Sequence, residues 1–335
     1  MNAPRRVLPL AVLVLACVGF VSPGASRHTA PTTASAPAAP SAFVASASAP
    51  FVASASAPAV TPLDDLLPVA VLPATERASR IESRSFLSAS LGRTMPYLVY
   101  LPPGYGDDPG RRYPTVYLLH GYGGSGRQWI DVGATVAADR LMGAGDIGSF
   151  LIVMPEGENA YWVDHANGGP KWGSFVAVDL VRQVESSYRV LTGRENRAIG
   201  GLSMGAHGAL QLALNFPGTF SAVGARSLVL RRFGNAPDYF GNAAEYAKRD
   251  PMQLVKAKKD VAKSLALWVD IGTLDPWEPL ARQFDGELNA LGIGHRWNEY
   301  PGGHSAAYWG ANLADYLRFY DAAFNPRLSA AAASD

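Results

Sequence analysis

One serine in this sequence has the surroundings of a nucleophile. A short apolar run ends in Gly-Leu-Ser-Met-Gly at 201–205, and an Ala- and Leu-rich pattern typical of a helix follows through Phe216. This order predicts a strand, a sharp turn and a helix, with Ser203 in a strained backbone conformation and small residues on both sides. The helix N-terminus would favour negative charge that develops beside the hydroxyl. The pattern alone is weak in a chain with 34 glycines, so its partners must be identified.

A nucleophilic serine needs a general base, and two histidines follow Ser203 at a useful distance. His304 comes after the last expected strand, in Pro-Gly-Gly-His-Ser, whereas His295 comes before that strand. Because catalytic side chains of such folds lie at the carboxyl ends of the strands, His304 is the expected base and His295 the weaker alternative. His207 lies one helical turn beyond Ser203, where packing is its expected role.

The carboxylate that orients the base should lie between the serine and the histidine in the chain. Asp275 follows a strand-like apolar run in Gly-Thr-Leu-Asp-Pro, so we expect it to complete a triad with Ser203 and His304. It is also suited to cap the helix that begins after it, and the two roles are compatible. Asp270 within the strand and Glu278 at the start of the helix are alternatives.

The negative charge of the transition state needs two preorganised hydrogen-bond donors. The backbone N–H of Met204, directly after the serine, is the expected first donor. The second should come from the loop His-Gly-Tyr-Gly-Gly at 120–124, where Tyr122 or Gly123 would supply it. We expect His120 to anchor this loop by hydrogen bonding rather than to transfer protons.

The same glycine loop has a rival interpretation. Gly121, Gly123 and Gly126 satisfy the dinucleotide fingerprint Gly-x-Gly-x-x-Gly after a strand. A dinucleotide site also needs an acidic residue about twenty residues further on, and Glu156 lies beyond that spacing. The His and acidic residues show no metal-ligand spacing. We therefore expect neither a cofactor nor a metal.

Several aromatic residues are candidates for a substrate pocket, although most should belong to the core and its rim. His165 is one of them. The tryptophan candidates are Trp129, Trp162, Trp172, Trp277 and Trp309.

Apolar runs alternate with helical patterns through most of the chain. The runs predict an antiparallel strand pair at 85–90 and 95–101, then strands at 113–119, 150–154, 197–200, 222–225, 265–271 and 296–300. Helices are expected at 133–142, 174–188, 204–216, 277–291 and 311–324. This alternation predicts the α/β class, with a mostly parallel central sheet, an antiparallel N-terminal strand pair and helices on both faces. The segment 226–263 interrupts the alternation and is either a lid or a surface excursion.

The N-terminal region has a different composition. Residues 1–25 contain Arg5 and Arg6 before an apolar run, which predicts a signal peptide and an exported protein. The single cysteine, Cys17, lies in this segment, and a bacterial lipoprotein signal lipidated at Cys17 is an alternative. Residues 26–75 are rich in Ala, Ser and Pro and repeat one octamer, which predicts a disordered linker. The expected folded domain is 76–328, followed by a disordered tail at 329–335.

Composition limits the partners. The formal net charge is +1 and no long charged run occurs, so nucleic acid is not an expected partner. A membrane partner is expected only if Cys17 is lipidated. The hydrophobic fraction of 48% is sufficient for a large core. A small molecule, polysaccharide or lipid ester is the expected substrate.

Five segments together resemble the esterase D-like (Putative esterase) family of α/β-hydrolases, which includes feruloyl and acetylxylan esterases, S-formylglutathione hydrolases and mycolyltransferases. They are Tyr-Leu-Val-Tyr-Leu-Pro at 97–102, Tyr-Leu-Leu-His-Gly at 117–121, Gly-Leu-Ser-Met-Gly at 201–205, the turn at 272–275 and Pro-Gly-Gly-His-Ser at 301–305. The resemblance implies the α/β-hydrolase fold, the triad Ser203, Asp275 and His304, and an oxyanion hole formed by the N–H groups of Met204 and Tyr122.

The sequence thus predicts an exported serine carboxylic-ester hydrolase that works through an acyl-enzyme on Ser203. Transfer of the acyl group to a sugar or lipid hydroxyl is an alternative within the same class. A non-catalytic, tethered surface-binding module is the alternative of another class. Several relatives carry Trp soon after the His-Ser pair, where this chain has Ala306 and Ala307, so the shape of the acyl pocket stays open.

Overall fold

A computed structural model of the chain describes residues 78–325. The expected signal peptide at 1–25 with Cys17, the expected linker at 26–75 and the expected tail at 329–335 lie outside these residues. No helix within 78–325 is both long and apolar enough to cross a membrane.

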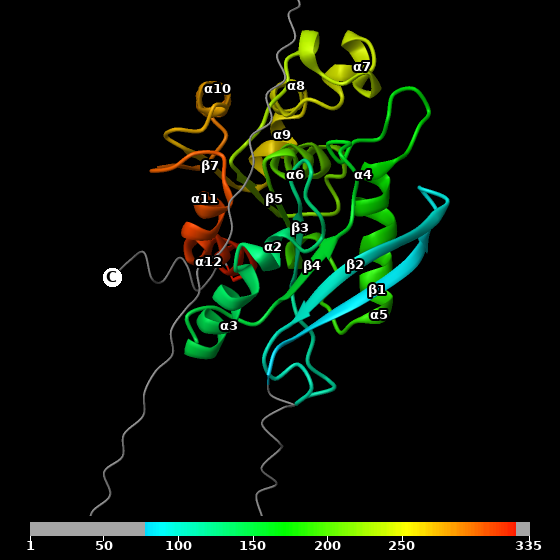
Figure 1. The fold of residues 1–335 in the computed structure, drawn as a ribbon, viewed down its shortest axis with the longest axis vertical. Coiled ribbons are helices and arrows are strands. Elements are labelled where there is room, and N and C mark those ends of the chain that lie inside the picture. Colours follow the sequence, from blue (N-terminus) through cyan, green and yellow to red (C-terminus); the bar gives the residue numbers. More distant parts are fainter. Residues whose placement is uncertain (1–77, 326–335) are drawn as a thin grey trace, which may run out of the picture. The chain divides into compact units, whose positions relative to one another are not determined.

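Eight strands form one sheet in the order β1-β2-β4-β3-β5-β6-β7-β8 (Figure 1). The strands are β1 (Arg80–Ser88), β2 (Arg93–Leu101), β3 (Thr115–Leu119), β4 (Leu151–Pro155), β5 (Arg197–Leu202), β6 (Ala222–Arg226), β7 (Ala266–Gly272) and β8 (Arg296–Tyr300). β2 pairs antiparallel with both β1 and β4, and every other neighbouring pair is parallel. The expected mostly parallel sheet with an antiparallel N-terminal pair is confirmed.

Helices cover both faces of this sheet, as predicted. They are α2 (Gln128–Asp131), α3 (Ala134–Ala144), α4 (Trp172–Ser174), α5 (Val181–Ser187), α6 (Met204–Asn215), α7 (Ala243–Ala247), α8 (Pro251–Ala257), α9 (Lys259–Lys263), α10 (Glu278–Ala290), α11 (Ala306–Ala311) and α12 (Leu313–Phe324). Alternate side chains of a strand face opposite sides. Tyr117 and Leu119 of β3 therefore join the core that includes α5, α6 and α10, whereas Val116 and Leu118 join the core beneath α3 and α12.

One predicted helix differs from the structure, and the helix directly before α12 was not predicted. The expected helix at 174–188 begins at α4 and contains a π-helical turn, η1 (Phe175–Leu180), before α5. Within that turn, the Asp179 carboxylate accepts hydrogen bonds from Ser88 Oγ (2.6 Å) and the Ser90 N–H (2.8 Å), which ties the helix to the β1-β2 turn. The expected helix at 311–324 corresponds to α12, whereas α11, which begins at Ala306 after the capping side chain of Ser305, was not expected.

The segment after β6 is a packed part of the fold. It contains two 3-10 turns, η3 (Phe233–Asn235) and η4 (Asp238–Phe240), followed by α7, α8 and α9. Phe240 and Leu254 are buried, and the Arg249 carbonyl lies 2.9 Å from Nε2 of His207 on α6. The residues 226–263 are thus held against α6, and the expectation of a purely surface excursion is wrong.

Candidate active site

The turn between β5 and α6 holds Ser203 in a left-handed backbone conformation, with φ 58° and ψ −119°. The Ser203 N–H donates a hydrogen bond of 2.9 Å to the Arg226 carbonyl at the end of β6. A Cβ at position 201 would run into the backbone of Gly205, and a Cβ at 205 would run into the Leu119 carbonyl. Glycine is therefore required on both sides of the serine, as predicted.

Three side chains from separate strand ends form a continuous hydrogen-bonded chain. Ser203 Oγ lies 2.8 Å from His304 Nε2, and His304 Nδ1 lies 2.8 Å from Asp275 Oδ2. Ser203 follows β5, Asp275 follows β7 and His304 follows β8. The Asp275 side chain is fully buried, whereas that of His304 is 23% exposed. The structure thus brings together the serine, histidine and aspartate that the sequence singled out, with the histidine open to solvent.

Asp275 is surrounded by donors that favour its ionised form. Burial acts to raise the pKa of the Asp275 carboxyl, but hydrogen bonds from His304, the Trp277 N–H and Ser227 outweigh it and hold the pKa below its usual value. Trp277 donates at 3.0 Å to Oδ1, and Ser227 Oγ donates at 3.0 Å to Oδ2. The carboxylate is therefore ionised at neutral pH and accepts a hydrogen bond from the Nδ1–H of His304, so that Nε2 of the histidine faces Ser203.

The alternative residues have other partners. His295 Nε2 lies 2.7 Å from Asp285 Oδ1 on α10. Glu278 accepts a hydrogen bond of 2.6 Å from Arg282 on the same helix. Asp270 is buried and accepts hydrogen bonds from Trp268 Nε1 and Tyr308 OH, both at 2.7 Å. None of these three alternatives forms a hydrogen bond with Ser203 or His304 among residues 78–325.

Tyr308 fixes the chain that follows His304. Its hydroxyl donates to Asp270 on β7, and its carbonyl accepts a hydrogen bond of 3.1 Å from the buried Arg226 on β6. The start of α11 is thus tied to two central strands. This arrangement restricts the loop that carries the histidine, because His304 lies only four residues before Tyr308.

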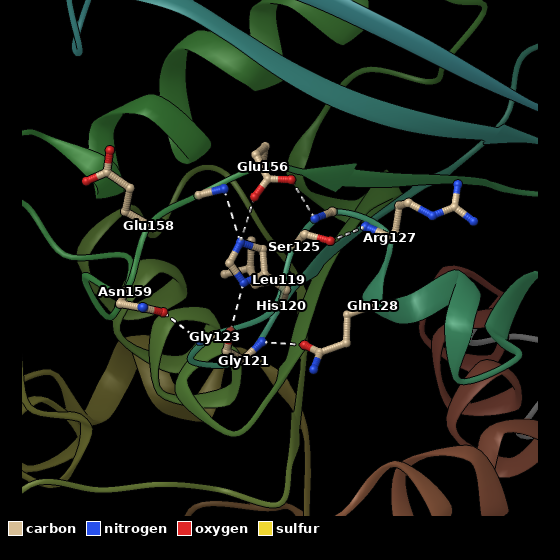
Figure 2. A network of polar contacts seen from close by, with 12 residues as sticks. Leu119, His120, Gly121, Gly123, Ser125, Arg127, Gln128, Glu156, Glu158 and Asn159 are labelled. Atoms are coloured by element: carbon tan, nitrogen blue, oxygen red, sulfur yellow. Dashed lines mark hydrogen bonds and ion pairs between the residues drawn. The ribbon is translucent and has the colours of Figure 1, made fainter. Parts of the chain in front are cut away.

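The glycine loop after β3 is held by side chains that no sequence pattern indicates. The Gly121 N–H donates to Gln128 Oε1 (2.7 Å), and the Gly123 N–H donates to Asn159 Oδ1 (2.6 Å), as Figure 2 shows. Gln128 lies on α2, and Asn159 lies on the loop after β4. No spacing in the sequence indicated either residue, because their roles depend on two loops meeting in space.

His120 anchors the same loop (Figure 2). Its Nδ1 lies 2.9 Å from the Gly121 carbonyl, and its Nε2 accepts a hydrogen bond of 3.1 Å from the Gly157 N–H. Burial lowers the pKa of the His120 imidazole, so the ring is neutral and its Nδ1 carries the proton. Glu156 contributes as well, since its Oε2 accepts a hydrogen bond of 2.9 Å from the Gly126 N–H.

Two backbone N–H groups near the serine have no hydrogen-bond acceptor in the part of the chain that the structure describes. Among the described residues, the N–H groups of Tyr122 and Met204 have no backbone or side-chain acceptor. The loop lies against the serine, because a Cβ at Gly121 would be 3.2 Å from Ser203 Cβ. Of the two loop donors considered from the sequence, Gly123 is already bonded to Asn159, so Tyr122 is the one that is available.

The tryptophan candidates fall into two groups. Trp129, Trp162 and Trp172 are 0%, 1% and 1% exposed, so the prediction that they line a substrate pocket is wrong. Trp129 Nε1 donates to the Leu119 carbonyl and Trp162 Nε1 to that of His120, which explains why these rings are internal. Trp277 and Trp309 are half-buried, beside Asp275 and His304 respectively.

A hollow of about 590 Å³ opens beside the glycine loop. Gly123 and Asn159 line it, together with His165 and Tyr239, whose rings stack 4.3 Å apart. Among residues 78–325, no group of three or more His, Cys, Asp or Glu side chains is placed to hold a metal ion. The serine hydroxyl thus lies within hydrogen-bond reach of a histidine that an aspartate orients, and a recess with one aromatic pair opens beside the glycine loop.

Comparisons with known proteins agree with this architecture. Residues 88–320 match the family described as Putative esterase. An acetyl esterase of Caldicellulosiruptor saccharolyticus is 27% identical over 259 residues, which are 69% of this chain and 94% of that protein. An esterase of Mycobacterium tuberculosis is 26% identical over 270 residues, and this chain spans only 58% of its length.

Solved structures show the same fold. A ferulic acid esterase superposes with a TM-score of 0.67 at 25% identity, over 73% of this chain and 98% of that one. A fluorophosphonate-binding serine hydrolase of Staphylococcus aureus, FphF, superposes with a TM-score of 0.63 at 19% identity, over 72% of this chain and 98% of that one. The chain belongs to the Putative esterase family of α/β-hydrolases and is a carboxylic ester hydrolase.

Proposed function

We propose that Ser203 is the nucleophile of this hydrolase, His304 its general base and Asp275 the carboxylate that orients the base. The observation that carries the proposal is the pair of 2.8 Å contacts from Ser203 through His304 to Asp275. The left-handed conformation of Ser203 supports it, because such strain in a residue other than glycine concentrates at functional sites.

In the first half of the reaction, His304 Nε2 takes the Ser203 proton while Oγ attacks the ester carbonyl. The N–H groups of Met204 and Tyr122 donate to the resulting oxyanion. The tetrahedral intermediate then collapses, the alcohol leaves with the proton held by His304, and the acyl group stays on Ser203. Water attacks the acyl-enzyme with the same base and releases the acid. These steps require no cofactor.

The substrate that we propose is a carboxylic ester of a small acid with an alcohol or sugar. The names of the acetyl esterase and the ferulic acid esterase support this class. The recess beside the glycine loop offers room and polar groups for the remainder of such a molecule. Water is the proposed acceptor, since these relatives are named as esterases.

Active-site labelling of the full chain tests the proposed nucleophile. A fluorophosphonate should label Ser203, as found by peptide mapping, and Ser203→Ala should abolish both labelling and hydrolysis of 4-nitrophenyl acetate and butyrate. Equal hydrolysis rates for the wild type and Ser203→Ala would contradict the proposal. Product analysis with an added sugar alcohol separates hydrolysis from acyl transfer, because only transfer produces a new ester.

We also propose that the protein is exported. Arg5 and Arg6 followed by the apolar run from Val7 to Val21 support this location. Cell fractionation and N-terminal sequencing of the mature protein test it. A mature chain that begins at a lipid-labelled Cys17 would identify a lipoprotein, whereas an intact Met1 in the cytoplasmic fraction would contradict export.

A further inference from the structure

One arginine beside the proposed active site has aromatic partners instead of a carboxylate. Arg231 follows β6, and its Nε donates a hydrogen bond of 2.6 Å to the Tyr161 hydroxyl. Its guanidinium carbon lies 5.4 Å from the centre of the Tyr161 ring and 4.8 Å from the centre of the Trp277 ring. The two rings hold the guanidinium by cation–π contacts, which leave its charge in place.

These two rings locate Arg231 relative to the serine. Trp277 is two residues from Asp275 and donates its N–H to that carboxylate. Tyr161 packs edge-on against His207, with the ring centres 5.1 Å apart, and His207 lies one turn beyond Ser203 on α6. Through these two rings, Arg231 thus connects the loop that carries Asp275 to the first turn of α6, which begins directly after Ser203.

The positive charge of Arg231 is not neutralised by the part of the chain that the structure describes. No acidic oxygen of residues 78–325 lies within 4.0 Å of its nitrogens, although Arg231 and Asp250 both line a second hollow, of about 270 Å³. Arg197 and Arg249, in contrast, each form an ion pair with a glutamate. Within the same residues the two terminal nitrogens of Arg231 donate no hydrogen bond. A planar guanidinium with two available nitrogens is suited to bidentate recognition of a carboxylate.

The backbone that presents Tyr161 to Arg231 is strained. Tyr161 and Trp162 have φ values of 52° and 57°, a conformation that side chains larger than glycine rarely adopt, and they do so in succession. The buried Trp162 donates to the His120 carbonyl, so the strained pair is fixed to the glycine loop. Such strain persists where the surroundings require it, and it concentrates at binding sites.

We propose that the Arg231 guanidinium binds a carboxylate of the substrate, so that the preferred esters are anionic. The inference rests on the proposed function and names its substrate class. The carboxylate could belong to the acid half of the ester, as in a dicarboxylic monoester, or to the alcohol half, as in an ester of a hydroxy acid. Both present the same group to Arg231, and kinetics distinguish them.

Two pairs of esters test the proposal on the full chain. In the acid arm, mono-4-nitrophenyl glutarate is compared with 4-nitrophenyl butyrate. In the alcohol arm, 4-acetoxybenzoate is compared with its methyl ester. The measured quantity is the ratio of kcat/KM for the anionic ester to kcat/KM for the neutral ester. Arg231→Gln should lower this ratio by about tenfold in one arm, because a charge-assisted hydrogen bond is lost. Intrinsic reactivities cancel when the variant is compared with the wild type.

Arg232→Gln is the matched control, because Arg232 is the exposed neighbour of the same charge, and its ratios should equal those of the wild type. Ratios unchanged by Arg231→Gln in both arms would overturn the inference. If circular dichroism shows that Arg231→Gln does not fold, the salt dependence of the wild-type ratio decides. Screening should lower that ratio between about 0.01 M and about 1 M salt, and a constant ratio overturns the inference. Failure to hydrolyse any of the four esters would overturn the proposed function and this inference with it.

Discussion

At the scale of single residues, the proposed mechanism gives Asp275 an effect on catalysis through the histidine that it orients. Asp275→Asn replaces the ionised acceptor with an amide, so His304 loses the partner that holds its proton on Nδ1. We expect kcat to fall by a factor on the order of 10³ to 10⁴ with the fold intact, measured by 4-nitrophenyl acetate hydrolysis. Glu278→Gln, three residues further along the chain, is the control and should retain activity. A kcat for Asp275→Asn close to that of the wild type would assign the orienting role elsewhere.

A second aspartate affects stability. Burial raises the pKa of Asp250 from 3.8 to about 6, although the Gln253 N–H, Tyr246 and Lys256 favour its ionised form. The folded state then binds more protons than the unfolded state between these two values. The contribution of Asp250 to stability should therefore be greatest below pH 3.8 and should be lost as the pH rises through about 6.

Asp250→Asn should remove most of this pH-dependent loss. Asparagine keeps the acceptor that caps α8 at the Gln253 N–H and has no charge to desolvate. We expect the variant to gain roughly 1 to 2 kcal/mol of unfolding free energy relative to the wild type between pH 4 and pH 7.5, measured by urea denaturation. Asp238→Asn, at an exposed position of the same segment, is the control. A parallel pH dependence for wild type and Asp250→Asn would contradict the account.

The order of residues along the chain explains which site residues could be predicted from the sequence. Ser203, Asp275 and His304 each follow their own strand, so the alternation of strands and helices was enough to single them out. Asn159 and Ser227 could not be found in this way, since each acts on a loop that is distant in sequence. Three of the tryptophans were wrongly predicted to line a substrate pocket, because a large ring is compatible both with a pocket wall and with the core. Only the packing in the folded protein distinguishes these two positions.

At the scale of elements, the glycine loop depends on acceptors from its neighbours. Asn159→Ala removes the acceptor of the Gly123 N–H and frees the loop to move relative to Ser203. The Tyr122 N–H, the proposed second donor to the oxyanion, would then be less well aligned, and kcat should fall by about tenfold with little change in KM. Steady-state kinetics on 4-nitrophenyl butyrate measure this. Glu158→Gln, at the neighbouring exposed position, should behave as the wild type, and a change confined to KM would contradict a loop-positioning role.

The contact between α12 and the sheet depends on glycines in the strands. A Cβ at Gly224 would be 2.6 Å from Tyr316, whose hydroxyl donates at 2.9 Å to the Gly224 carbonyl. Gly224→Ala should therefore cost about 1 to 3 kcal/mol of unfolding free energy through overpacking. Gly286→Ala, in the exposed middle of α10 with open space around it, should instead stabilise the protein by about 0.5 to 1 kcal/mol. Thermal denaturation compares the two, and equal shifts would contradict the packing argument.

Element boundaries were predictable where one pattern dominated. The strand expected at 296–300 coincides with β8, because its flanking loops are rich in glycine. The spacing of apolar residues did not indicate the π-helical turn η1. Such a turn inserts one residue, and the resulting rotation of the following apolar positions is smaller than the width of the buried stripe of the helix. The short helices α7, α8 and α9 were missed because none is long enough to establish a period.

At the scale of the whole molecule, the sheet and the proposed site are contained in one continuous part of the chain. All eight strands, together with Ser203, Asp275 and His304, lie between Arg80 and Phe324. The two cores that cover the faces of the sheet are also built from residues within this range. A protein limited to residues 76–328 therefore retains every contact on which the arguments above depend.

We expect residues 76–328 to fold alone, with Tm within a few degrees of the full chain and kcat/KM for 4-nitrophenyl acetate within about twofold, because a domain with its own core is independently stable. Ser203→Ala in both lengths controls for background hydrolysis. A large loss of Tm in the short protein would mean that residues 1–75 bind the folded part. A loss of kcat/KM at unchanged Tm would instead mean that they contribute to substrate binding, because stability and activity then separate.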